Sequence, residues 1–536
     1  MRGRPIIIAL GFGLTAVAGF WLARSAAPEM TANKGNTSPA KQVQSVFDRD
    51  EPAPEFRRGE RKVVFKSDDE AMEQGALVGQ RALLFKDREA LEAFLKRAAD
   101  RNIKIMGRID ALNALRVGFL NYDDLADLLD GSEELAMIFP VELPESGSVG
   151  AQAGAVPIGA RLLEMLGITM DNSDWGKGVK IAILDTGVSR HSAFSGDIFS
   201  LGYGTTAAAE GDVNGHGTAV ASMILGDSSL LPGVAPGSTI LSIQIADANG
   251  SATSMDLAQG IIAAADGGAA IINISMGSLG DSALVRSAIA YARERGILIV
   301  AATGNNGSQQ ISYPAGNSGV LAIGAVDGTA THLAFSNSGD SVALAAPGFA
   351  INAAWVDDGA VAVSGTSFSA PIISGLIAGT MTNNSTGKTL TAAQAYQLIV
   401  DNSNEAAAPG YDNQTGNGVP NMTRVMNSGK KGIYDAALAS NWITSDTSGT
   451  KLQVVVENRG TETLINTSVQ VTGSAGNSAY NITTLPVGAI QVFNVPFTAS
   501  GPTVSVNSSV RLSGGQKDAN RNNDSRAETL TIQPGN

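Results

Sequence analysis

Four polar positions in this sequence carry side chains that could act on a carbonyl group. Asp185 ends the apolar run VKIAILD, His216 lies in NGHGTAVASMIL, and Ser367 lies in SGTSFSAPIISG. Asn305 follows the apolar run ILIVAATG. A hydroxyl nucleophile, an imidazole base, an orienting carboxylate and an amide donor are the groups that acyl transfer through a covalent intermediate requires.

The Asp-Thr-Gly segment that begins at Asp185 leaves three interpretations open. It could be half of an aspartic protease dyad, the orienting carboxylate of a serine triad, or a strand that enters a tight turn. An aspartic protease needs two carboxylates that share a proton, and the chain has no second Asp-Thr-Gly or Asp-Ser-Gly. Dimerisation could supply the second carboxylate, but the His and Ser segments would stay unexplained. The serine triad is therefore favoured.

His216 and Ser367 each precede or begin an apolar helical run. A helix N-terminus disfavours a charged imidazole, and it offers free backbone N–H groups to a developing oxyanion. Taken alone, each residue would fit a structural role at a helix start. The other two histidines, His191 and His332, receive no direct role, because one follows the Asp segment closely and the other lies in a polar turn.

The elements that must position these residues lie between about 156 and 428. Short continuous apolar runs alternate there with helical patterns such as MDLAQGIIAAADGG and SALVRSAIAYARERG. This alternation is typical of a parallel sheet with helices on both faces. Functional groups gather at the carboxyl ends of the strands of such a sheet, where Asp185, Ser275 and Asn305 lie.

Two further domains flank this region. Residues 62–142 predict the order β-α-β-β-α-β, which is a ferredoxin-like α+β arrangement. Residues 143–155 are small and lack periodicity, so that they form an accessible linker. Residues 430–536 alternate in period two, are rich in Val and Thr, and predict an all-β sandwich.

The N-terminus predicts export. Arg2 and Arg4 precede an apolar run over 6–23. Residues 1–27 are therefore interpreted as a signal peptide or, alternatively, as a retained membrane anchor. Residues 28–61 are polar and form a linker. Both alternatives export the remainder of the chain.

Composition excludes several classes of function. The chain has 536 residues, enough for two to four domains, and a net charge of −13, which argues against a nucleic-acid partner. It has no cysteine, which excludes disulfides, thiolate catalysis and Cys-ligated zinc.

The motifs together resemble the subtilisin family (subtilases) of serine proteases. ILDTGV, NGHGTAVAS and SGTSFSAP resemble its three catalytic motifs in the family's Asp, His, Ser order, and AATGNNG resembles its oxyanion motif. The resemblance implies a subtilisin-like α/β fold in which Asp185, His216 and Ser367 form the triad. Asn305 and the backbone N–H of Ser367 would stabilise the oxyanion.

The resemblance also implies partners. NISMG resembles the family's substrate-pairing strand, so that Ser275, Met276 and Gly277 would bind an extended peptide. Residues 62–142 resemble the family's propeptide, an inhibitor and folding chaperone, and cleavage within 143–155 would release the mature enzyme. The expected product is a secreted or envelope-associated serine endopeptidase made as a self-processing zymogen.

Departures from the family pattern bear mainly on metal binding. Ala219 and Ser222 replace residues common in the family without removing a catalytic group. Residues 226–236 are shorter than the family's calcium loop, which argues against calcium there. Structural calcium elsewhere stays open, the metal ligands are unassigned, and the chemistry itself requires no cofactor. The loop KDANRNND, with Asp518 and Asp524, is interpreted as a polar turn.

Two other functions remain to be weighed. The subtilase-like domain could be an inactive scaffold for an adhesion protein whose sandwich binds a surface ligand, although all four catalytic residues are present. An esterase could use the same triad, but a strand-pairing segment suits peptides better.

Overall fold

A computed structural model describes residues 68–144, 155–202, 211–446, 449–474, 476–496, 501 and 503–531. The proposed signal peptide or anchor at 1–27, the linker at 28–61 and most of the processing linker at 143–155 lie outside these residues. Within them, no helix is long and apolar enough to cross a membrane. The chain divides into two compact units, with a boundary between Lys431 and Gly432.

An antiparallel four-stranded sheet, in the order β2-β3-β1-β4, begins the described chain. This part (residues 68–144) is called the N-terminal region below. Its β-α-β-β-α-β order confirms the predicted ferredoxin-like arrangement, with a further short helix in front. The elements are α2 (Asp68–Glu73), β1 (Gln80–Phe85), α3 (Arg88–Ala98), β2 (Ile103–Ile109), η1 (Asp110–Leu112), β3 (Ala114–Phe119), α4 (Tyr122–Ala126) and β4 (Glu133–Met137).

The sequence predicts one last strand over LAMIFPVEL, and the structure divides it in two. β4 ends at Met137, and β5 (Pro140–Glu142) belongs to another sheet, where it pairs with β11 (Ser251–Thr253). Pro140 has no N–H to donate to a continuing ladder, and the chain leaves the first sheet there. The end of the N-terminal region therefore pairs with a strand of the central domain.

A seven-stranded sheet forms the centre of the larger unit, in the order β15-β14-β13-β12-β6-β10-β8. Every neighbouring pair in this sheet is parallel, which confirms the predicted α/β class. The strands are β6 (Lys180–Asp185), β8 (Ile198–Ser200), β10 (Thr239–Gln244), β12 (Ile271–Ile274), β13 (Leu298–Ala302), β14 (Val320–Val326) and β15 (Val342–Pro347).

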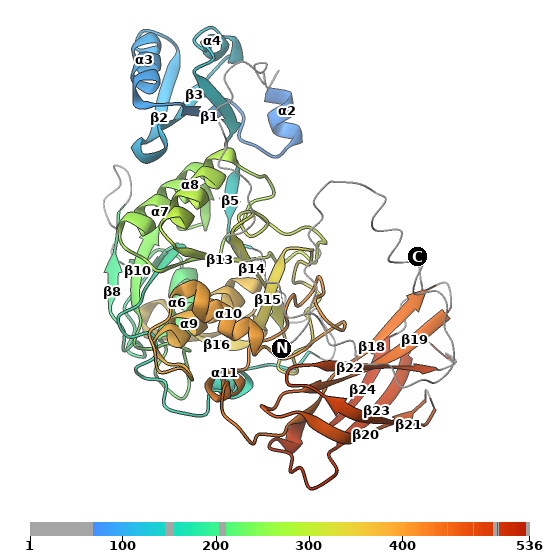
Figure 1. The fold of residues 1–536 in the computed structure, drawn as a ribbon. Coiled ribbons are helices and arrows are strands. Elements are labelled where there is room, and N and C mark those ends of the chain that lie inside the picture. The colour runs from blue at the N-terminus through green and yellow to red at the C-terminus, as the bar shows by residue number, and fades with distance from the viewer. Residues whose placement is uncertain are drawn as a thin grey trace. The chain divides into compact units, whose positions relative to one another are not determined.

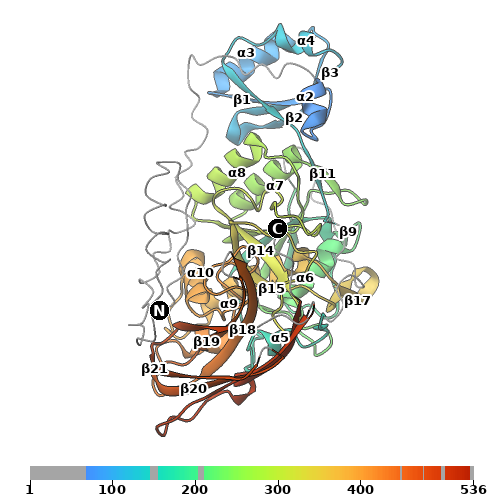
Figure 2. The same ribbon diagram turned by 90° about the vertical axis from the view of Figure 1, so that its right-hand side faces the viewer.

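Helices cover both faces of this sheet. α6 (His216–Leu225) and α9 (Thr366–Thr382) share one apolar core with the sheet, while α7 (Ser254–Asp266) and α8 (Ala283–Glu294) share the other. Figures 1 and 2 both place α7 and α8 next to the N-terminal region, whose strands contribute to the same core. The N-terminal region therefore packs on the central domain through these two helices.

Smaller elements complete the larger unit. They are α5 (Leu162–Met165), β7 (Gly187–Val188), β9 (Gly211–Asp212), the hairpin of β16 (Ile351–Trp355) and β17 (Gly359–Val363) with η2 (Val356–Asp358) at its tip, α10 (Ala392–Asp401) and α11 (Met422–Asn427). The hairpin precedes α9 directly, so that it leads the chain into the segment that carries Ser367.

The second unit is a β-sandwich, as the period-two pattern predicts. One sheet has the order β18-β19-β22 and the other β21-β20-β23-β24, with Val, Leu and Ile side chains packed between them. Its elements are β18 (Ala436–Asp446), β19 (Gly449–Asn458), β20 (Leu464–Gly473), β21 (Ser478–Leu485), β22 (Ile490–Pro496), β23 (Thr503–Arg511), η3 (Arg521–Asn523) and β24 (Ser525–Thr531).

Candidate active site

Asp185 ends the inner strand β6, between β12 and β10. Its side chain is fully buried. One carboxylate oxygen, Oδ1, accepts hydrogen bonds from the backbone N–H of Thr186 at 2.8 Å and from its hydroxyl at 3.2 Å. These donors fix the direction of a carboxylate at the end of the strand.

His216 is the first residue of α6, and its imidazole is held by Asp185. The distance from Nδ1 to Asp185 Oδ1 is 2.8 Å. An ionised carboxylate only accepts, so we assign the proton to Nδ1, which leaves Nε2 of the neutral ring as a base. The side chain is only 12% exposed, and the ring centroid lies 5.4 Å from that of Phe368, the residue after Ser367.

Gly215 caps the helix that carries His216 and has a φ of 109°. A Cβ at this position would lie 2.3 Å from the ring of Trp355, which comes from the hairpin before α9. Glycine is therefore required twice, for the left-handed backbone and for the close approach of the indole.

Ser367 is the second residue of α9 and is 2% exposed. Its hydroxyl donates to the carbonyl of Ser275 at 3.0 Å, while the Ser275 hydroxyl donates to the Ser367 carbonyl at 2.7 Å. In the described part of the chain no hydrogen bond joins Ser367 to His216. The Ser367 hydroxyl must leave the Ser275 carbonyl before the histidine can receive its proton.

Asn305 lies beside the first turn of α9. Its side-chain oxygen accepts from the backbone N–H of Thr366 at 2.9 Å and from the Thr366 hydroxyl at 2.8 Å. The orientation of the amide is thus fixed, and Nδ2 lies 2.8 Å from where a Cβ on Gly365 would be. An amide donor held next to the Ser367 turn is suited to an oxyanion.

The segment Ser275–Gly277 binds an extended strand of the same chain. Gly277 exchanges two backbone hydrogen bonds with Glu142, each of 2.9 Å. On the other edge of that strand β11 pairs with β5, and Leu143 donates to the carbonyl of Gly250 at 3.1 Å. Met276 turns its side chain into the core, where it is fully buried. The end of the N-terminal region is therefore the middle strand of three.

Asp212 is a residue that motif reasoning missed. Its Oδ1 accepts from the Thr186 hydroxyl and from the backbone of Asn214 and Gly215, at 2.8–2.9 Å. Its Oδ2 accepts from the N–H and hydroxyl of Thr218, both at 2.8 Å. The carboxylate ties the Asp185 loop to the first turn of the His216 helix. An Asp four residues before the histidine is the only signal in the sequence.

A buried polar chain below Ser367 was also not anticipated. Asn273, in the middle of β12, donates to the Ser275 hydroxyl and accepts from the Ser374 hydroxyl, each at 3.0 Å. All three side chains are fully buried, and buried polar groups need such partners. These bonds connect the Ser275–Gly277 segment to the helix that carries Ser367.

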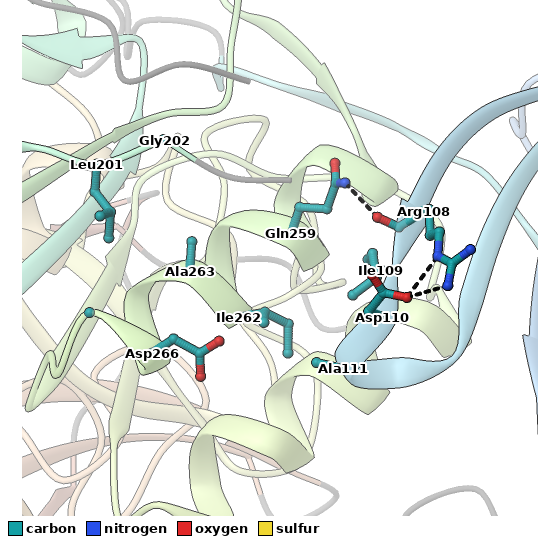
Figure 3. Close-up of a pocket in the computed structure, with 11 residues that line it drawn as sticks. Arg108, Ile109, Asp110, Ala111, Leu201, Gly202, Gln259, Ile262, Ala263 and Asp266 are labelled. Carbon is teal, nitrogen blue, oxygen red and sulfur yellow. Dashed lines mark hydrogen bonds and ion pairs between the residues drawn. The ribbon is translucent and has the colours of Figure 1, made fainter. Parts of the chain in front are cut away.

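The N-terminal region contacts the central domain through polar groups as well. Arg116 donates to the Thr253 hydroxyl at 3.1 Å, and burial lowers the pKa of its guanidinium. Gln259 of α7 donates to the carbonyl of Arg108 at 3.1 Å. Figure 3 shows this bond at the edge of a cavity of about 560 Å³ between α7 and the β2–β3 connection. No lining residue of this cavity belongs to the triad.

The two remaining histidines lie outside the triad contacts. His191 bonds through Nε2 to the carbonyl of Gly359 at 3.0 Å and accepts from the N–H of Ala193 through Nδ1 at 3.1 Å. Burial lowers the pKa of His332 to about 4. Within the described residues no group of three or more acidic or histidine side chains is arranged to hold a metal ion.

The central domain is similar to proteins of known family. Residues 176–418, which include all four catalytic candidates, match the subtilase family. Subtilisin Savinase from Lederbergia lenta is 36% identical over 208 residues, which make up 38% of this chain and 76% of that protein. The chain belongs to the subtilase family.

A second relative and a solved structure also match part of the chain. The thermostable alkaline protease of Halalkalibacterium halodurans is 37% identical over 209 residues, 38% of this chain and 57% of the relative. The chain thus spans little more than half of that relative. The solved structure of the prenylagaramide maturation protease PagA is 28% identical, with a TM-score of 0.42, over 50% of this chain and 97% of that one.

Proposed function

We propose that this subtilase is a serine endopeptidase, exported and made as a self-processing zymogen. The proposal rests on one observation: a histidine bonded to a buried carboxylate lies at the same site as a bound peptide strand. His216 is hydrogen-bonded to a buried carboxylate at 2.8 Å, and a strand of the same chain occupies the peptide-pairing segment beside Ser367. A base next to a bound peptide strand supports peptide-bond cleavage.

In the proposed reaction, the Ser367 hydroxyl leaves the Ser275 carbonyl and turns toward His216. Its oxygen attacks the scissile carbonyl carbon, and Nε2 of His216 takes its proton. The oxyanion is stabilised by Nδ2 of Asn305 and the backbone N–H of Ser367. When the C–N bond breaks, His216 returns the proton to the leaving amine. Water then hydrolyses the acyl-enzyme by the same two steps, and Asp185 stabilises the imidazolium in both.

The N-terminal region is the proposed propeptide and acts as an inhibitor and folding chaperone. Glu142 and Leu143 fill the edge that a substrate would need. The Ser367 hydroxyl is meanwhile bonded to a carbonyl and is not bonded to a base. Cleavage within 143–155 followed by release of this region would open the cleft. Substrates are proteins and peptides that can adopt the extended conformation.

The remaining assignments are extensions of this proposal. The proposed chemistry needs no cofactor. Export delivers the enzyme to the cell envelope or the medium, with residues 6–23 as a cleaved signal or an anchor. The sandwich would contribute a binding surface. None of these assignments is needed for the catalytic step.

Self-processing provides the test. The chain from residue 28 onward is expressed as wild type and as Ser367→Ala, and intact masses and new N-termini are determined. The proposal expects a cut within 143–155 in the wild type that the variant lacks. Two full-length proteins, or the same cut in both, would contradict self-processing by Ser367. Adding purified wild-type enzyme to the variant then shows whether the same bond can be cut in trans.

A further inference from the structure

The strand pairing of the N-terminal region extends one residue beyond β5. Phe139 donates its backbone N–H to the Ser254 hydroxyl at 3.1 Å and accepts at its carbonyl from the Ser254 N–H at 2.9 Å. The register in which Glu142 faces Ser251 and Pro140 faces Thr253 thus continues onto the first residue of α7. Ser254 is 1% exposed, so these bonds are shielded from water and add to the binding of the strand.

The Phe139 side chain packs closely against a glycine of the central domain, Gly280. The ring is 4% exposed. A Cβ on Gly280 would lie 2.1 Å from the ring atoms Cδ1 and Cε1. Gly280 is not among the glycines with positive φ, so its backbone conformation is open to other residues. The glycine therefore leaves room for the ring and is not demanded by the backbone.

We propose that Ser254 and Gly280 form a remote subsite of the cleft that binds an aromatic residue of the substrate. The bound residue lies three positions to the amino side of the one that pairs with Gly277. The proposal rests on the proposed function, because it takes the path of Phe139 to Glu142 as the path of a substrate. The two hydrogen bonds of Ser254 to the peptide backbone make peptides long enough to reach it bind more tightly. The space above Gly280 favours a planar aromatic ring.

When the N-terminal region is released, some of the side chains that surround Phe139 are removed with it. Its other apolar neighbours, Ala71, Ala76 and Met137, belong to that region. A substrate ring would keep the Gly280 face and expose the other. Half-burial of one ring supports a preference of about fivefold for Phe over Ala, well below that of a closed pocket.

Product-like peptides test the subsite without knowledge of the cut position. Peptides copying residues 136–143, AMIFPVEL, carry Phe, Leu or Ala at the position of Phe139. Each is used as a competitive inhibitor of casein hydrolysis by the self-processed full chain. A control peptide has Ala at that position and Phe at the next, where the strand turns side chains to the opposite face.

The Phe peptide is expected to bind about fivefold more tightly than the Ala peptide, and the control peptide about as weakly as the Ala peptide. Gly280→Val should remove the difference, because its side chain takes the place of the ring. Ser254→Ala should weaken every eight-residue peptide several-fold and leave peptides that begin at Pro140 unchanged. The second variant preserves the test if the first does not fold.

Inhibition constants within twofold for Phe, Leu and Ala would overturn the subsite, as would a preference for Phe that survives Gly280→Val. Casein hydrolysis in those experiments would leave the proposed protease function standing. If the protein shows no casein hydrolysis that a fluorophosphonate can block, the proposed function is contradicted, and the subsite with it. The two failures are therefore separate.

Discussion

The carboxylates of the candidate active site and those of the sandwich loop around Asp524 differ in what surrounds them. At the candidate active site, Asp185 Oδ1 and both carboxylate oxygens of Asp212 accept hydrogen bonds from N–H and hydroxyl donors, which orient them. In the sandwich, burial and the charges of Asp518 and Asp435 raise the pKa of Asp524 to about 6. The oriented carboxylates belong to the proposed catalytic machinery, whereas in the sandwich cluster the neighbouring acidic groups and burial disfavour the ionisation of Asp524.

Acidic residues alone therefore do not reveal a functional site. The donors around a carboxylate decide what it can do, and these donors come from elements that the fold brings together. The pH responses of the units should also differ, because burial lowers the pKa of His332 in the larger unit to about 4. Each prediction below tests one side of this comparison.

The largest effect is expected from Asp185→Asn. The new amide can turn its NH₂ group toward His216 Nδ1, which now donates to the carboxylate. It would then favour the His216 tautomer whose proton lies on Nε2, and that tautomer cannot act as the base. We expect the rate of self-processing to fall by about 10⁴, the loss known for this change in serine protease triads. The rate is followed by intact mass after refolding.

The exposed Asp227 provides the matched control for that variant. Asp227→Asn should self-process within about twofold of the wild type, as surface changes usually do. An Asp185→Asn protein that retains a tenth of the wild-type rate would break the link between oriented carboxylate and catalysis.

His332 should make the larger unit sensitive to acid. The folded state holds its pKa near 4, below the unfolded value of about 6.5. Between pH 6.5 and 4 the histidine is protonated in the unfolded chain but stays neutral in the folded chain. The free energy of unfolding therefore falls as the pH drops from about 6.5 to 4. The loss is at most about 3 kcal/mol.

Denaturant unfolding of Ser367→Ala, which avoids autolysis, measures this slope. Adding His332→Gln should flatten the curve of unfolding free energy between pH 6.5 and 4. Equal slopes with and without the histidine would show that it titrates freely in the folded state.

Asp212→Ala should cost less than the loss of Asp185. The change leaves the backbone N–H groups of Asn214, Gly215 and Thr218 without their acceptor. We expect a loss of about 2 kcal/mol in unfolding free energy and an approximately tenfold slower hydrolysis of casein, as the His216 helix loosens. Asp212→Asn keeps one acceptor oxygen and should lose less in both. If the Ala variant matches the wild type, the carboxylate has no positioning role.

The smallest effect is expected in the sandwich. The folded state raises the pKa of Asp524 to about 6, so ionisation destabilises this unit as the pH rises from about 4 to 6. Asp524→Asn should stabilise the sandwich at pH 7 by about 1 kcal/mol, after a discount for solvent screening. Calorimetry of the full chain in the Ser367→Ala background measures the sandwich transition at pH 4 and 7. A gain that is equal at both pH values would contradict an electrostatic cause.

The strands of the central sheet could be predicted because they are buried on both faces. Runs such as 179–185 and 297–305 are continuous and apolar, and their polar ends mark Asp185 and Asn305. The sandwich was predictable for a related reason, since β23 alternates buried and exposed residues.

Contacts between distant segments could not be predicted in the same way. The bond from Ser367 to Ser275, the position of Trp355 over Gly215 and the pairing of Phe139 with Ser254 each join residues from separate elements. No local pattern encodes them. The division of the last predicted strand has the same origin, because β5 takes its partner from the central domain.

The central claim is that Ser367 is the nucleophile of a serine endopeptidase. The self-processed protein is treated with a biotinylated fluorophosphonate, digested and mapped by mass spectrometry. A single adduct on Ser367, matched by the loss of casein hydrolysis, is the predicted result. A protein that hydrolyses casein at full rate after exhaustive labelling, or an adduct on another residue with Ser367 unmodified, would contradict the account.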